Sequence, residues 1–76
     1  MSEQTVTSKD AKALAVRYLA FNEACDNKDD EGIWIWGDML LESQERTGAY
    51  LYEAEFLSSC VNRARARDAG QKQQAA

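Results

Sequence analysis

The scarcity of helix-breaking residues is the feature that most constrains this chain of 76 residues. It contains no proline, and its four glycines stand at positions 32, 37, 48 and 70. Because proline and glycine are the residues that most often interrupt a helix, long helices are permitted here, and three of the glycines fall where a helix is expected to turn or stop. With 45% apolar residues, the chain is also rich enough to bury the core of one domain.

Apolar residues recur at helical spacing in three segments, which predicts an all-α fold: a small bundle of three antiparallel helices. The expected helices cover about 8–25, 33–46 and 49–68. Thr7 or Ser8 can cap the first, with Asp10 completing a pattern like a capping box, and Thr47 and Gly48 end the second. The apolar run 33–36 could also form a short buried strand, but we favour a helix because the chain offers no partner strand.

The chain divides into a flexible N-terminal segment (1–7), one helical domain (8–69) and a disordered, amide-rich tail (70–76) that follows a helix stop at Gly70. The N-terminal stretch has neither a basic start nor an apolar segment, so we expect no secretory signal. Apolar runs are too short to span a membrane, and we expect a cytoplasmic chain.

Catalysis and metal binding are disfavoured by the residue types present. The chain has no histidine, and its two cysteines, Cys25 and Cys60, are far apart in sequence, so we expect buried, reduced thiols. No nucleophile stands beside a base, and no glycine-rich phosphate loop occurs. We therefore predict a protein that is not an enzyme and has no cofactor.

One acidic segment has spacing that faintly resembles an EF-hand calcium loop. Its candidate positions are Asn27, Asp29, Glu31, Gly32, Trp34 and Asp38. The first position of such a loop normally needs Asp and the twelfth a Glu that binds through both oxygens, and here Asn and Asp stand there. An acidic turn that caps the following helix explains the same residues with fewer assumptions.

The formal net charge of −4 argues against a general nucleic-acid binder. The one basic cluster is Arg63, Arg65 and Arg67, and on a helix Arg63 and Arg67 share a face while Arg65 points away. Cations near a helix C-terminus complement its dipole, which is the simpler explanation. A transcriptional regulator that binds nucleic acid through these arginines remains the alternative function.

Surplus hydrophobic residues, beyond the one stripe that each helix needs, are the most informative functional feature. Aromatic residues in such positions are typical of protein interfaces, although they can also complete a small core. We predict that the partner-binding residues are Trp34, Trp36, Leu41, Tyr50, Tyr52 and Phe56. An acidic rim is expected from Asp29, Asp30, Glu31, Asp38, Glu53 and Glu55.

These features together predict a small acidic protein that binds and regulates or inhibits another protein, one with a basic surface. The same aromatic surplus favours a homodimer, because self-interfaces and foreign interfaces select the same residue types. Size and composition are typical of the small proteins that phages and mobile elements direct against host proteins, an analogy rather than a derivation.

Overall fold

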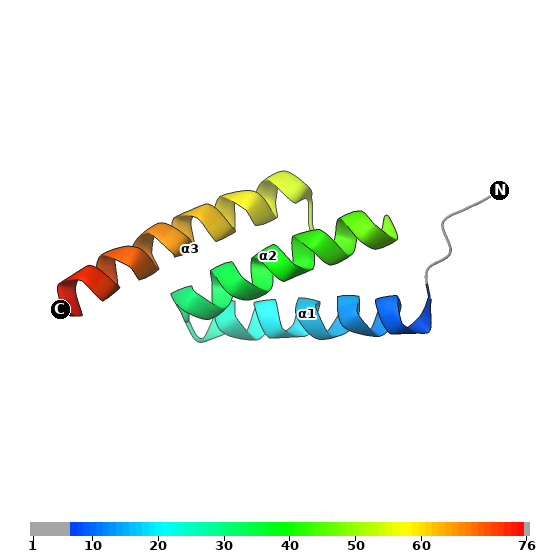
Figure 1. Cartoon of the computed structure of the whole chain (residues 1–76), viewed down its shortest axis with the longest axis horizontal. Helices are drawn as coiled ribbons and strands as arrows, with labels where there is room; N and C mark the ends of the chain where they lie inside the picture. The colour runs from blue at the N-terminus through cyan, green and yellow to red at the C-terminus, as the bar shows by residue number, and fades with distance from the viewer. Residues whose placement is uncertain (1–6, 76) are drawn as a thin grey trace.

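A computed structural model describes residues 7–75 of the chain and shows three helices (Figure 1). They are α1 (Ser8–Asp26), α2 (Asp30–Thr47) and α3 (Ala54–Ala75). The amide of Asp10 donates to Oγ1 of Thr7 at 3.1 Å, which confirms the predicted cap of α1. The predicted all-α fold is confirmed, with no strand in residues 7–75, and the run 33–36 is helical.

The central helix is α2, because α1 and α3 both pack against it (Figure 1). Within the described part of the chain, the backbones of α1 and α3 do not approach each other. All three helices nevertheless contribute apolar side chains to the core. The buried apolar residues are Leu14, Phe21, Ala24, Ile33, Leu40, Leu57, Val61 and Ala64.

Gly37 lies where both neighbouring helices come closest to α2. A Cβ atom at this position would stand 2.5 Å from Cγ2 of Val61 in α3 and 3.2 Å from Cε1 of Phe21 in α1. Such distances are closer than packed carbon atoms tolerate. The missing side chain therefore lets α1 and α3 use the same point on α2.

Both ends of α2 are defined by capping. The carboxylate of Asp29 accepts a hydrogen bond from the amide of Gly32 at 3.3 Å, so the helix begins at Asp30 rather than near 33 as the sequence predicts. At the other end Gly48 has φ 76°, a left-handed conformation that suits glycine, and its amide donates to the carbonyl of Gln44. The predicted stop at Thr47 and Gly48 is confirmed.

The predicted bounds of α3 are wrong at both ends. The helix begins at Ala54 instead of 49, because residues 48–53 form a connection that is not helical. It ends at Ala75 instead of 68, and it passes through Gly70, which remains helical and has open space where a Cβ atom would stand. The division into segments 1–7, 8–69 and 70–76 stays a prediction, and residues 1–6 and 76 lie outside the described part.

Candidate partner-binding surface

The fully buried side-chain amide of Gln44 makes most of the hydrogen bonds that hold the connection between α2 and α3, and Oγ1 of Thr47 accepts one more, from the amide of Ala49. Oε1 of Gln44 accepts hydrogen bonds from the amides of Leu51 (2.9 Å) and Tyr52 (3.0 Å). Its Nε2 donates to the carbonyl of Tyr52 at 3.0 Å. Three hydrogen bonds thus satisfy backbone groups that have no helix or strand to pair with, and they fix the conformation of the connection.

This fixed connection exposes large apolar side chains. Tyr50 is 53% exposed and Leu51 is 48% exposed, and Phe56, in the first turn of α3, is 48% exposed. We call these three residues the corner patch. A shallow hollow of about 450 Å³ lies beside it, lined by Leu51, Tyr52, Glu53 and Phe56. The corner patch therefore offers apolar surface together with a concavity that a partner side chain can enter.

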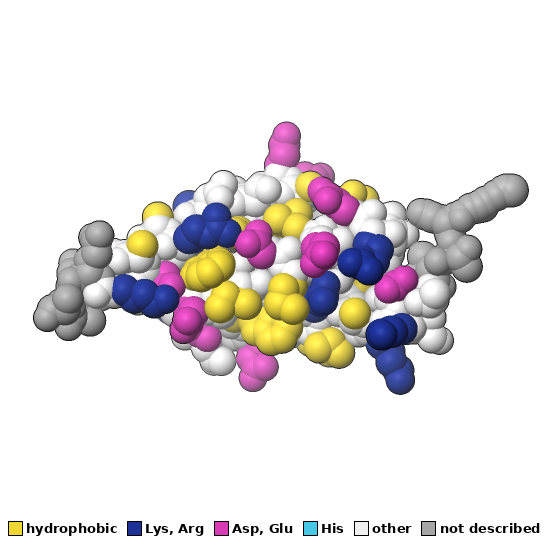
Figure 2. Space-filling view, in the orientation of Figure 1, with side chains coloured by type: hydrophobic (Ala, Val, Ile, Leu, Met, Phe, Trp, Pro, Cys, Tyr) yellow, Lys and Arg dark blue, Asp and Glu magenta, His cyan; other side chains and the backbone are white. Residues whose placement is uncertain are grey.

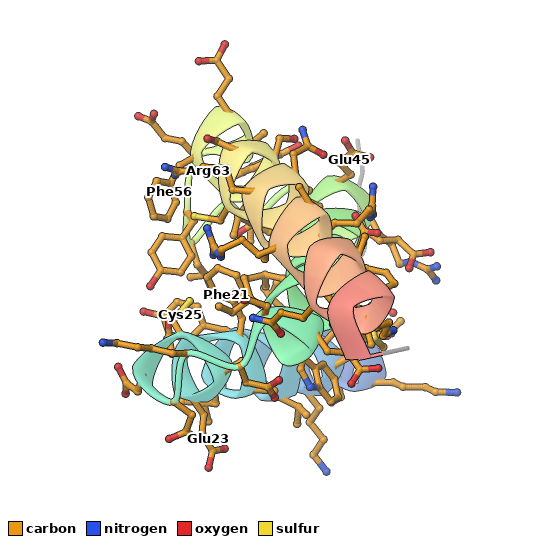
Figure 3. All side chains as sticks on the ribbon, turned by 90° about the vertical axis from the view of Figure 1, so that its left-hand side faces the viewer. Phe21, Glu23, Cys25, Glu45, Phe56 and Arg63 are labelled. Carbon is orange, nitrogen blue, oxygen red and sulfur yellow. The ribbon has the colours of Figure 1, made fainter. Side chains whose placement is uncertain are left out.

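Tyr52 connects the corner patch to the core. Its ring centroid lies 5.3 Å from that of Phe56, 5.5 Å from that of Tyr18 and 5.7 Å from that of Phe21. Its hydroxyl donates to Oδ1 of Asn22 at 2.6 Å, and burial raises its pKa, which keeps the donor proton in place. These aromatic contacts thus pack the corner patch against the core. Figure 3 shows Phe56 and Phe21 on the same side of the view.

The two tryptophans of the predicted partner-binding set are half-buried, and Trp34 is engaged by α3. Trp34 donates from Nε1 to Oδ2 of Asp68 at 3.0 Å, and the guanidinium of Arg65 lies 5.0 Å from its ring centroid. Trp36 and Leu41 are half-buried against the core. The structure therefore brings Tyr52 and Phe56 together, leaves Tyr50 exposed on the same connection as Tyr52, and engages Trp34 with α3, while a partner-binding role for all six residues stays a prediction.

Asp68 is the polar anchor of this tryptophan. The residue is only 8% exposed, and its carboxylate also lies 3.2 Å from Nζ of Lys72. The hydrogen bond from Trp34 lowers the pKa of Asp68, burial acts in the opposite direction, and Lys72 adds to the lowering. The carboxylate consequently stays ionised and joins α2 to α3.

Most residues of the predicted acidic rim form ion pairs or a helix cap within the molecule. Oδ1 of Asp30 lies 3.0 Å from Nε of Arg67, and Oδ2 of Asp38 lies 2.9 Å from a guanidinium nitrogen of Arg65. Glu31 stands 3.9 Å from Lys72, and Asp29 caps α2. The remaining rim residues, exposed and in the stretch of chain that carries the corner patch, are Glu53 and Glu55. Figure 2 shows the resulting surface, with acidic and basic side chains interleaved around a group of hydrophobic ones.

The arginine cluster is divided as the helical spacing predicts. Arg63 and Arg67 line one groove, whereas Arg65 lies over Trp34. Two of the three guanidinium groups, those of Arg65 and Arg67, are paired with carboxylates of α2. Phosphate binding would have to compete with these ion pairs, so the geometry does not favour a nucleic-acid interface.

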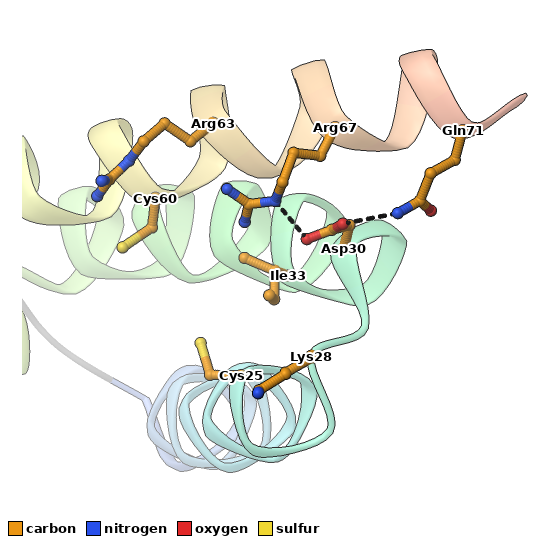
Figure 4. A pocket seen from close by; sticks show the side chains of 8 residues that line it. All are labelled: Cys25, Lys28, Asp30, Ile33, Cys60, Arg63, Arg67 and Gln71. Atoms are coloured by element: carbon orange, nitrogen blue, oxygen red, sulfur yellow. Dashed lines mark hydrogen bonds and ion pairs between the residues drawn. The ribbon is translucent and has the colours of Figure 1, made fainter. Parts of the chain in front are cut away.

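A groove of about 600 Å³ runs between α1 and α3 (Figure 4). Its lining residues are Cys25, Lys28, Asp30, Ile33, Cys60, Arg63, Arg67 and Gln71. Cys25 is exposed, so the prediction that it is buried is wrong, and Cys60 is half-buried. Desolvation, then the neighbouring Cys60 and Asp26, raise the pKa of Cys25, which disfavours the nucleophilic thiolate.

The calcium-loop pattern does not form a loop. Most of its residues lie in the first turns of α2, which begins at Asp30, and Asp29 is used as the helix cap. In the part of the chain that the structure describes, no group of three Cys, Asp or Glu residues is arranged to hold a metal ion. The acidic turn is therefore explained by capping.

Sequence reasoning missed two features of this surface. Gln44 has no pattern that marks it as an anchor, because a glutamine in a helix is normally exposed. Val16 and Leu19 are both exposed. The sequence could have indicated this, because both residues lie off the apolar stripe of α1.

In three comparisons, no protein-family model, no curated protein and no solved structure matches the chain. None of the helices in residues 7–75 combines the length and hydropathy needed to cross a bilayer.

Proposed function

We propose that this protein is a non-catalytic regulator or inhibitor that acts by binding another protein through the corner patch. The observation that carries the proposal is the exposure of Tyr50 and Leu51 on a connection that Gln44 and Tyr52 hold in place, with exposed Phe56 lining the same hollow as Leu51. Preformed aromatic surface binds with a small loss of conformational entropy, because the side chains and backbone are already ordered.

The charges near the patch suggest the kind of partner. Glu53 and Glu55 are exposed near it, and among the described residues neither forms an ion pair of the kind that Asp30 and Asp38 form. A negative rim steers a positively charged surface into contact and raises the association rate. We therefore propose a partner with a basic surface around an apolar side chain that enters the hollow.

We also propose that neighbouring helices are antiparallel and that the protein is a cytoplasmic homodimer. Two contacts support the antiparallel course of α2 and α3: Asp30 meets Arg67, and Asp38, further along α2, meets the earlier residue Arg65. The compact helical fold and the negative net charge suit a freely diffusing binder.

The test is partner capture with matched variants. The tagged chain would be incubated with nuclease-treated lysate of its native cells, and bound proteins would be quantified by mass spectrometry for the wild type and for Leu51→Ser/Phe56→Ser. We expect the specific partner to fall by more than tenfold in the variant, because the apolar centre of an interface carries most of its binding free energy.

The matched control is Ala66→Ser/Ala69→Ser, which places the same serines at two exposed positions of α3 that lie ten or more residues beyond Phe56. Circular dichroism should show unchanged helicity in both variants, since exposed positions contribute little to folding. Equal capture by wild type and corner-patch variant would refute the proposal. A second variant, Glu53→Gln/Glu55→Gln, should weaken capture at low salt more than at high salt.

A further inference from the structure

The outer face of α1 carries exposed apolar side chains that residues 7–75 leave uncovered. Val16 is 58% exposed and Leu19 is 64% exposed. The buried residues of α1, among them Leu14 and Phe21, lie on the opposite side of the helix, against α2. Figure 3 shows Glu23, one helical turn beyond Leu19, on the side of α1 that faces away from both other helices.

The spacing on this face is that of a helix–helix seam. Six exposed residues follow one another at alternating intervals of three and four, the repeat that keeps side chains along one stripe of a helix. They are Lys9, Lys12, Val16, Leu19, Glu23 and Asp26. We call this set the α1 seam. Its centre is apolar, its N-terminal half is cationic and its C-terminal half is anionic.

We propose that the α1 seam is the site at which two copies of this chain associate, with the two α1 helices antiparallel. This inference deepens the proposed function, since it rests on the homodimer included there and names the surface that forms it. An antiparallel pair centred between Val16 and Leu19 places each Val16 opposite the partner's Leu19. Lys12 then faces the partner's Glu23.

Charge complementarity selects a second copy, and one orientation of it. In the antiparallel pair, Lys12 meets Glu23 twice across the two-fold axis, and Lys9 meets Asp26 in the same way. A parallel pair would set lysine against lysine and acid against acid, which destabilises association. The sequence of the seam is thus complementary to itself only when the helices run in opposite directions.

Small side chains flank the seam and allow close approach. Ala15 and Ala20 lie on its two sides. In the antiparallel pair, Ala15 of one copy lies opposite Ala20 of the other. The apolar area is limited to two large side chains from each copy, so we expect a weak dimer with a Kd on the order of tens of micromolar.

Sedimentation equilibrium of the full chain, up to about 1 mM, tests the proposal with charge-reversal variants. Lys12→Glu alone creates two repulsive contacts with Glu23, and Glu23→Lys alone creates two with Lys12. We expect each variant to raise the dimer Kd by about tenfold. An equimolar mixture of the two variants should restore association, because each new acid then meets a new lysine in the other chain.

Both substitutions leave the fold intact by design. Lys12→Glu puts an acid in the N-terminal half of α1, and Glu23→Lys puts a cation near its C-terminus, so the helix dipole favours both changes. A wild type that stays monomeric up to about 1 mM, or a mixture that fails to restore association, would overturn the inference. Corner-patch variants should keep the dimer, so this proposal and partner binding can fail separately.

Discussion

The two connections of this protein are built on different principles. The first, 27–29, is stabilised by bonds within its own stretch of chain: the amide of Lys28 donates to the carbonyl of Cys25, and that of Asp29 to the carbonyl of Ala24. The second, 48–53, depends on the side chain of Gln44, which reaches residues seven and eight positions away. Local chemistry shapes one connection, and a tertiary contact shapes the other.

The difference explains what each connection can do. The first connection is short and polar, and its Asp29 is used for capping α2. The second connection can carry exposed Tyr50 and Leu51 in a fixed arrangement, because its backbone is satisfied from inside the molecule. A buried anchor of this kind frees the outer side chains for binding.

The largest expected effect is at the anchor itself. Gln44→Leu keeps the size of the side chain but leaves two amides and one carbonyl of the second connection without partners, so we expect a loss of about 3 kcal/mol in the free energy of unfolding, measured in urea. Glu45→Leu, at an exposed neighbouring position, is the control and should change stability by less than about 0.5 kcal/mol. Similar losses in the two variants would mean that Gln44 is not the anchor.

The next effect concerns the chain reversal after α2. Gly48→Ala places a Cβ on a residue with φ 76°, which we expect to cost about 1 kcal/mol. Gly70→Ala makes the same chemical change in a helical position with open space around it, where we expect a gain of about 0.5 kcal/mol. Thermal unfolding of both variants checks the opposite signs, and a loss in both would contradict the conformational explanation.

The first connection contains Asp29, the N-terminal cap of α2, and loss of this cap should lower the stability of the protein. Asp29→Ala removes the acceptor for the amide of Gly32, with an expected loss of about 1 kcal/mol in chemical denaturation. Asp29→Asn retains a capping oxygen and should recover most of the stability. If Asp29→Ala costs as much as Gln44→Leu, the contrast between the connections is broken.

The smallest effect is a gain. Lys28 has φ 55° at the position after α1 where glycine is preferred, so we expect Lys28→Gly to stabilise the protein by about 0.5 kcal/mol. Asn27→Gly, at a residue with φ −88°, should instead destabilise it. Midpoints of thermal unfolding that move in the same direction for both variants would contradict this assignment.

Local signals predicted much of the fold. The cap at Thr7 and the stop at Gly48 follow from residues close together in sequence, whereas the helical nature of 33–36 was inferred from the lack of a partner strand elsewhere in the sequence. The start of α3 was predicted wrongly because Tyr50 continues the apolar periodicity of a helix, and no breaker separates it from Ala54. Only the contact with Gln44 reveals the connection, and such a contact has no signature in the local pattern.

The candidate site was predictable in kind but not in extent. Surplus aromatic residues indicate an interface, and Tyr50 and Phe56 are indeed exposed. Trp34 has the same composition signal, yet Asp68 and Arg65 engage it within the fold. Residue type alone cannot distinguish a tryptophan that joins two helices of one chain from a tryptophan that binds a partner protein.

The central position of α2 has a consequence for how quickly the protein folds. Each helix packs on the helix next to it in sequence, and within residues 7–75 the backbones of the first and last helices stay apart. Most native contacts therefore lie within one helix or between helices that are neighbours in sequence. Chains with such low contact order reach the native state in times on the order of microseconds to milliseconds. A newly made chain would hide its apolar surface almost as soon as α3 is complete.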